Sequence, residues 1–254
     1  MTTSTPHWPS RIRAAGIHLI LSAIVGGVAG ALIFGVWYPW PYREVSGGES
    51  LFWLLVSVDV TLGPLLTLAV FNIRKPRAEL VRDLVVIGCL QLAALGYGGW
   101  VLFQARPVHL VFEVDRFRVV SAIDVEPAEL PEAPAELRRL PLLGPTLISV
   151  RQPAEQKERL EAIDMALQGR DLSMRPQYWI PYAASRSDVL RKSEALPAYV
   201  LRKPSQREAL LRAAQRSGLP AESLRLLPLL MRAASWTVLI DGQGDPVGFA
   251  DVDY

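Results

Sequence analysis

Residues 17–36 read IHLILSAIVGGVAGALIFGV, a run without a charged side chain. At 1.5 Å per residue, a helix over such a run spans the roughly 30 Å hydrocarbon core of a bilayer. The run is longer than the apolar region of a signal peptide, and no small-residue cleavage site precedes the aromatic residues at 37–40, so we favour a retained helix over a cleaved signal. Residues 51–71 and 84–103 are two further apolar segments of sufficient length. We therefore predict a three-helix transmembrane region over residues 17–103.

The composition agrees with a chain that lies partly in lipid. The 254 residues are 50% hydrophobic and have a mean hydropathy of +0.22, which is more apolar than a soluble domain of this size needs. The net charge is only +2, so no strong positive field indicates a nucleic-acid partner. The single cysteine, Cys89, excludes an intrachain disulfide, and His7, His18 and His109 are too scattered to form a ligand set. The sequence predicts neither a metal nor a cofactor.

Basic residues set the expected orientation. The loop between the second and third segments is rich in arginine and lysine, whereas the loop between the first and second holds only Arg43. By the positive-inside rule, the N-terminal residues 1–16 and the second loop face the cytoplasm of a bacterial inner membrane, and residues 104–254 lie in the periplasm. The aromatic residues expected at the outer interface are Trp37, Tyr38, Trp40, Tyr42 and Trp53.

Residues 104–254 have the patterns of an α+β domain. The runs at 108–114 and 116–120 are rich in β-formers, and 236–240 with 247–252 flank a turn that indicates a terminal hairpin. Five prolines at 126–145 disfavour a continuous helix or a central strand there, so we interpret that stretch as a linker. Helices are expected at 154–168, 187–194 and 205–217.

Three stretches carry a resemblance to a known family: YPWPYREVSGGESLFWLLVSVDVTLGPLLTLAVFN at 38–72, RPVHLVFEVDRFRVVSAIDV at 106–125 and VLIDGQGDPVGFADVD at 238–253. The chain resembles the type IV pilin accessory proteins of the TfpX/TfpZ family over nearly its full length. The resemblance implies three membrane helices with a periplasmic domain, and a role in pilin assembly or surface piliation. It implies a pilin subunit as partner, with other pilus-assembly proteins also expected. It supplies no active-site residue.

The residues themselves offer little catalytic chemistry. The outer domain has one histidine, His109, for which a structural role is the simpler interpretation, and no GxSxG, HExxH or P-loop pattern occurs. The acidic residues at 241–253 do not match a calcium-binding loop and are better explained as turn and strand-end carboxylates. We therefore expect a protein that is not an enzyme.

Asp59 lies near the middle of the second apolar segment, where a carboxylate normally faces protein or water. Gly63 and Pro64 follow it, and we expect Pro64 to interrupt the helix because it cannot bond the Val60 carbonyl, with threonines helping to satisfy the freed groups. Asp59 either fixes the packing of the three helices or contacts a substrate helix or relays protons. Both interpretations stay open at this stage.

The first segment carries a face of small residues at every fourth position. Ala23, Gly27, Ala31 and Gly35 form one ridge, and Ser22, Gly26 and Gly30 form a second beside it. Such faces permit close approach of helix backbones. Their partner is either a helix of the same bundle, for example at Ala94 and Gly98, or the apolar N-terminal helix of a pilin.

Three classes of function follow. The first is a non-catalytic accessory protein that contacts pilin through its membrane helices and periplasmic domain. The second is a membrane-anchored periplasmic enzyme that modifies pilin or envelope components, which would need a concave pocket with convergent polar groups. The third is a sensor, for which the short cytoplasmic segments offer no output element.

Overall fold

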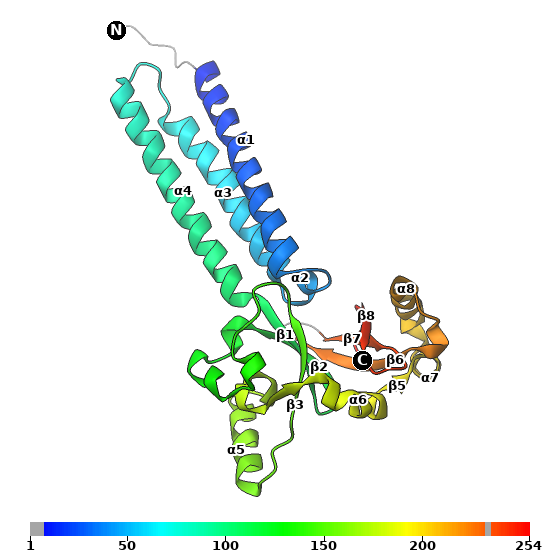
Figure 1. Cartoon of the computed structure of the whole chain (residues 1–254). Helices are drawn as coiled ribbons and strands as arrows, with labels where there is room; N and C mark the ends of the chain where they lie inside the picture. The colour runs from blue at the N-terminus through cyan, green and yellow to red at the C-terminus, as the bar shows by residue number, and fades with distance from the viewer. Residues whose placement is uncertain (1–7, 232–234) are drawn as a thin grey trace. The chain divides into compact units, whose positions relative to one another are not determined.

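The computed structural model describes residues 8–231 and 235–254; His7 and the rest of residues 1–7 lie outside them. The chain divides into two compact units (Figure 1). One unit comprises the residues up to Val36 together with Gly48–Gln104, and the other comprises Trp37–Gly47 together with Ala105–Tyr254. The connection at 37–47, which the sequence analysis included in the transmembrane region, thus groups with the C-terminal unit.

The first unit is built from three long helices. They are α1 (Trp8–Leu32), which continues as a π-helical turn η1 (Ile33–Trp37), α3 (Gly48–Val70) and α4 (Arg77–Ala105). All three are long and apolar enough to cross a membrane. A short helix α2 (Tyr42–Val45) lies in the connection between α1 and α3.

The second unit is an α+β domain around one mixed sheet. In its described part the strand order is β4-β3-β1-β2-β6-β7-β8, and β5 pairs with β6. Strand β1 is parallel to β3 and β2 is parallel to β6, whereas the other pairs are antiparallel. The strands are β1 (Pro107–Glu113), β2 (Arg116–Ser121), β3 (Thr146–Val150), β4 (Trp179–Pro181), β5 (Glu194–Ala195), β6 (Arg225–Leu230), β7 (Ser235–Ile240) and β8 (Pro246–Ala250).

The predicted α+β class is therefore confirmed, and the strands expected at 108–114, 116–120, 236–240 and 247–252 correspond to β1, β2, β7 and β8. Every residue of β1 is buried, because the strand lies inside the sheet and is covered on both faces. Strands β3 and β6, which the sequence analysis did not predict, are the parallel neighbours of β1 and β2.

The three expected helices of this domain are present with shorter bounds. They are α5 (Gln156–Leu167), α6 (Arg186–Lys192) and α8 (Arg207–Ser217), and α7 (Leu196–Arg202) is additional. The 3-10 turn η2 (Ala122–Asp124) precedes the proline-rich stretch, which itself contains the 3-10 turns η3 (Pro127–Glu132) and η4 (Ala135–Leu137). Its Ala133, Leu130 and Leu137 pack into the core, so this stretch covers the sheet instead of serving as a free linker.

Further 3-10 turns connect the remaining elements: η5 (Leu172–Met174), η6 (Pro176–Tyr178), η7 (Tyr182–Ser185), η8 (Pro204–Gln206) and η9 (Ala221–Ser223).

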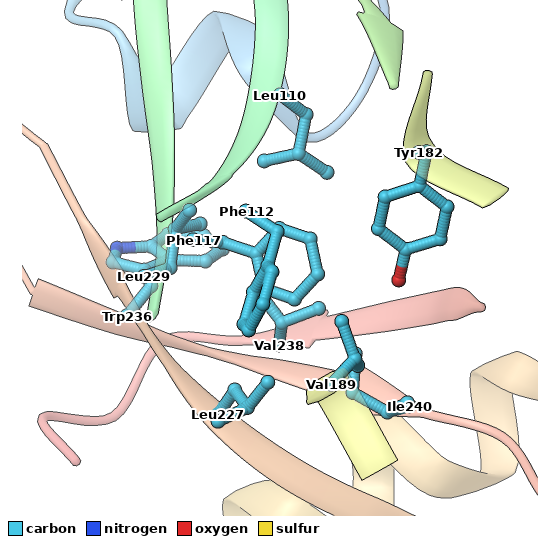
Figure 2. Packing of buried hydrophobic residues seen from close by; sticks show 10 residues of the cluster. All are labelled: Leu110, Phe112, Phe117, Tyr182, Val189, Leu227, Leu229, Trp236, Val238 and Ile240. Carbon is cyan, nitrogen blue, oxygen red and sulfur yellow. The ribbon is translucent and has the colours of Figure 1, made fainter. Parts of the chain in front are cut away.

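Three apolar clusters fill the interior of this unit. Figure 2 shows the first, in which Phe112 and Phe117 of the β1–β2 hairpin meet Val238 and Leu227 of the adjoining strands. The aromatic rings of Phe112 and Phe117 lie 5.5 Å apart. A second cluster joins the other side of β1 to Trp179, and a third lies between β6–β8 and helices α7 and α8. A domain of this size can fold on such a core without a disulfide.

The connection at Trp37–Gly47 packs into the same unit. Tyr38 is fully buried, and burial raises the pKa of its phenol. The Tyr42 ring lies 5.9 Å from that of Phe249, and the Arg216 guanidinium lies over the Trp40 ring. Tyr38 and Tyr42, which the sequence predicts at a membrane interface, are contacts of the folded domain in the structure: Tyr38 is buried in it and Tyr42 meets Phe249. Their place relative to a bilayer stays a prediction.

Candidate functional site

The three apolar helices enclose a cluster of polar side chains, which we call the polar cluster: Ser22 and His18 from α1, Asp59 and Thr67 from α3, and Gln91 from α4. Asp59, Gly63 and Thr67 follow one another at four-residue steps, so they share one face of α3. A hydrogen bond is the natural way to satisfy such groups in an apolar environment, because water is not available there.

His18 is the link between α1 and the other two helices. Its Nδ1 lies 2.5 Å from Thr67 Oγ1, and its Nε2 lies 2.6 Å from Gln91 Oε1. A carbonyl oxygen only accepts, so Nε2 of His18 donates to Gln91, and in the neutral imidazole Nδ1 is left to accept from the Thr67 hydroxyl. Both ring nitrogens thus have partners on different helices.

Gln91 completes the cluster. Its Nε2 donates to the Asp59 backbone carbonyl and to Asp59 Oδ1, each at 3.1 Å, and lies 3.4 Å from Ser22 Oγ. The Gln91 amide lies directly against Gly63, where a Cβ atom would collide with it. Glycine at position 63 is therefore what allows this side chain of α4 to reach α3.

Pro64 does not interrupt the helix, contrary to the sequence-based expectation. Helix α3 runs without a break from Gly48 to Val70 with Pro64 inside it. The helical hydrogen bonds before and after Pro64 keep the backbone helical, and proline is tolerated in this way in many membrane helices. Thr67, expected to help satisfy freed backbone groups, contacts His18 through its hydroxyl.

The two ridges of small residues on α1 have different surroundings. Ser22, Gly26 and Gly30 are buried, and a Cβ at Gly30 would lie 2.7 Å from the Phe52 ring of α3. In the part of the chain that the structure describes, a Cβ at Gly27 or Gly35 would meet nothing within 4 Å. Ala23 and Ala31 are exposed on the same ridge as these two glycines.

We call the exposed ridge, formed by Ala23, Gly27, Ala31 and Gly35, the small-residue face. Gly98 of α4, which was considered as a partner for α1, packs instead against the Leu55 side chain of α3. Helix α3 therefore receives a glycine contact from each neighbour, and no described residue of the unit covers the two glycines of the small-residue face.

His18 and Gln91 were not predicted from the sequence as members of a site. Asp59 was identified because a carboxylate is conspicuous in an apolar segment. A histidine and a glutamine in such a segment give a weaker signal, and only the structure brings together residues that are 73 positions apart. Their positions within predicted transmembrane segments were the available clue.

In the C-terminal unit, His109 and the terminal turn have structural surroundings. His109 is 1% exposed, its Nδ1 lies 2.7 Å from Thr146 Oγ1, and its ring meets the edge of Trp179 at 4.6 Å. Burial lowers its pKa to about 4. In the terminal turn, Asp241 Oδ1 accepts from the backbone N–H groups of Gln243 and Asp245. Within residues 8–231 and 235–254, no group of three metal-ligating side chains occurs.

Three long apolar helices and a mixed-sheet domain define a class of α+β protein with a helical region suited to a membrane. Residues 6–47 match the family model described as "Fimbrial assembly protein FimB". The chain is 36% identical over 231 residues to the fimbrial assembly proteins of serogroups I and E1 from Dichelobacter nodosus, covering 90% of each chain. A shorter relative from the same organism, of serogroups C1 and C2, is 42% identical over 121 residues, which is 48% of this chain and 92% of that protein.

The chain belongs to the fimbrial assembly protein family. This membership confirms the resemblance to pilin accessory proteins that the sequence analysis identified. No solved structure matches the chain.

Proposed function

We propose that this protein is a non-catalytic accessory protein of type IV pilus assembly, anchored in the bacterial inner membrane, which contacts pilin subunits during assembly or surface piliation. The observation that carries the proposal is the 36% identity over 90% of the chain to proteins named for fimbrial assembly. The matched region includes both units, so the proposed role uses the whole chain and not the helices alone.

The small-residue face is the proposed contact for the pilin helix. It is open within its own unit, and backbones can approach closely there. The polar cluster supports this use, because hydrogen bonds among α1, α3 and α4 keep the orientation of α1 fixed while a partner binds its outer side. In this proposal Asp59 is a packing residue of the bundle, held by Gln91.

The C-terminal domain offers a second proposed contact on α5. Leu160, Ile163 and Leu167 lie on one side of this helix and are 61%, 59% and 83% exposed. No residue of α5 is buried. Exposed apolar stripes of this kind are typical of surfaces that bind a partner, and we assign this one to periplasmic contacts during assembly.

The proposal of a non-catalytic role rests on the surroundings of the titratable groups. His109, the one histidine in residues 105–254, lies in the core with a depressed pKa. In the terminal turn, Asp241 accepts from two backbone N–H groups, and Asp245 forms an ion pair with Arg186. These arrangements serve folding, and they leave the pilin contact as the activity that the family membership supports.

The periplasmic placement of residues 105–254 rests on the distribution of basic residues and is tested by fusions. Alkaline phosphatase fused after residue 110 should be active, whereas a fusion at Lys75 should be inactive. An inactive fusion after residue 110 would contradict both the orientation and the periplasmic assignment.

The partner is tested by cross-linking in cells. Cysteine is placed at Gly27 in a Cys89→Ala background, because Cys89 is the one native cysteine and is exposed on α4. We expect a disulfide or bifunctional cross-link to a cysteine in the apolar helix of pilin, recovered by affinity purification. A matched cysteine at Val28, which is exposed on a different side of α1, should give less product. Cross-links confined to this protein would contradict the assignment of the small-residue face.

A further inference from the structure

A groove lies between the three helices near the first residues of α1 and the turn that joins α3 to α4. Its volume is about 480 Å³, and it is lined by side chains of all three helices. Ile17 and Leu21 come from α1, Thr67 comes from α3, Phe71 directly follows α3, and Leu84 and Gly88 come from α4. The wall area is almost entirely apolar, and the charged lining residue, Arg13, lies toward the end at which Ser10 begins the lining on α1.

The groove has the polarity of an amphiphile. From Arg13 to Leu21 the lining of α1 extends over about 12 Å at 1.5 Å per residue, which is most of the roughly 15 Å thickness of one leaflet. A cation near one end of an apolar groove of that length is complementary to a lipid whose headgroup is anionic and whose acyl chain points toward the bilayer centre. A helix of similar length and about 10 Å diameter would occupy roughly 900 Å³, twice the volume available.

Charges at this end of the bundle also favour an anion. Residues 8–16 and 72–83 contain six basic and two acidic side chains. The two acidic groups, Glu79 and Asp83, pair with Lys75. Among the described residues, no ion pair of Arg13 is formed, so its charge can attract a phosphate. Basic pockets between membrane helices are a known setting for anionic lipid headgroups.

We propose that this groove binds one anionic phospholipid, with an acyl chain between α1 and α4 and the phosphate at Arg13. The inference rests on the proposed membrane placement but not on the pilus role. A bound lipid would fill the space between α1 and α4 beside His18 and so support the polar cluster. The apolar walls favour a lipid over a free phosphate, because a free phosphate has no acyl chain to contact them.

The test uses the full-length protein purified in a non-ionic detergent. Phosphatidylglycerol should raise the temperature of unfolding by about 5 °C at saturation, and phosphatidylcholine with the same acyl chains should raise it by much less. Native mass spectrometry should detect one retained phosphatidylglycerol. Glycerol 3-phosphate, which has the phosphate but no acyl chain, should give no shift.

Two pairs of variants locate the site. Gly88→Leu places a side chain in the groove at a position where an added Cβ meets nothing within 4 Å, and it should abolish the shift. Gly27→Leu, at a glycine with an equally open Cβ position outside the groove, should keep the shift. Arg13→Gln should reduce the preference for phosphatidylglycerol, whereas Arg11→Gln should not. Equal stabilisation by both lipids, or an unchanged shift in Gly88→Leu or Arg13→Gln, would overturn the proposal, and none of these results depends on piliation.

Discussion

Gly63 of α3 leaves the space that the amide of Gln91 on α4 occupies, and a single added methyl group at position 63 would collide with that amide. Gln91 is also the residue that joins His18 to Asp59. The packing of two helices and the hydrogen bonding of all three thus depend on the same contact.

The first prediction follows from this contact. Gly63→Ala should displace Gln91 and lower the free energy of unfolding by about 1–3 kcal/mol, as overpacking of a close contact does. Gly27→Ala is the matched control, because its Cβ has open space, and it should change stability by less than about 0.5 kcal/mol. The measurement is unfolding of the full chain in detergent.

A double variant separates a steric cause from other effects. In Gly63→Ala with Gln91→Ala the collision is removed, so the loss should be smaller than the sum of the two single losses. Additive losses would mean that Gly63 and Gln91 do not share a contact.

The second prediction concerns Asp59, whose Oδ1 accepts from Gln91 Nε2. Asp59→Asn keeps an oxygen acceptor at that position and should retain most stability and protein abundance. Asp59→Leu removes the acceptor and should cost about 1 kcal/mol, the usual size of a hydrogen bond between membrane helices. Immunoblotting of membranes and unfolding in detergent measure both effects.

If Asp59 instead relays protons or needs its charge, Asp59→Asn will lose piliation as fully as Asp59→Leu while the protein stays abundant. That outcome would refute the packing role given to Asp59 here.

The third prediction uses the buried His109. Its pKa is about 4 in the folded chain and 6.5 ordinarily, so the unfolded chain binds more protons between these values. The contribution of neutral His109 to the free energy of unfolding is fully present above pH 6.5 and is lost as the pH falls toward 4. The loss in free energy of unfolding is at most about 3 kcal/mol for such a pKa shift.

His109→Gln removes this titratable group. The free energy of unfolding of the variant and of the native chain is measured from pH 7 to pH 4, with the fluorescence of buried tryptophan as the probe of unfolding. Carboxylates titrate in both proteins, so the difference between the two curves reports His109. Parallel curves over this range would show that His109 is not buried in its neutral form.

In the C-terminal domain, the elements that could be predicted are those marked by residue patterns over a short stretch of sequence. The β1 and β2 runs and the terminal hairpin were predicted because β-formers and turn residues lie close together in the chain. Strand β6 contains Pro228, which argues locally against a strand, and its parallel pairing with β2 joins residues more than 100 positions apart. Strand β3 also pairs in parallel with β1. Such long-range pairing leaves no periodic signal in a single sequence.

The candidate site was predictable only in part, for a similar reason. The small-residue ridges and Asp59 stand out in an apolar sequence, but which ridge is buried depends on Val56 and Phe52 of another helix. Nothing within residues 17–36 distinguishes Gly26 from Gly27. The three-dimensional arrangement makes the distinction, because one Cβ position faces α3 and the next faces outward.

The last prediction is that the small-residue face is required for piliation. Gly27→Leu with Ala31→Leu places two large side chains on the outer side of α1, where they should block the close approach of a partner helix. Insertion should be unaffected, because leucine is fully compatible with lipid, and the polar cluster should be intact, because neither residue is part of it. We therefore expect normal protein abundance with a severalfold loss of surface pili, measured by electron microscopy and by shearing of pili. The control variant Val28→Leu, at an exposed position on another side of α1, should form surface pili in normal amounts. If the double variant accumulates normally and supports full piliation, the client contact must instead be sought on the C-terminal domain, where the exposed side of α5 is the next surface to test.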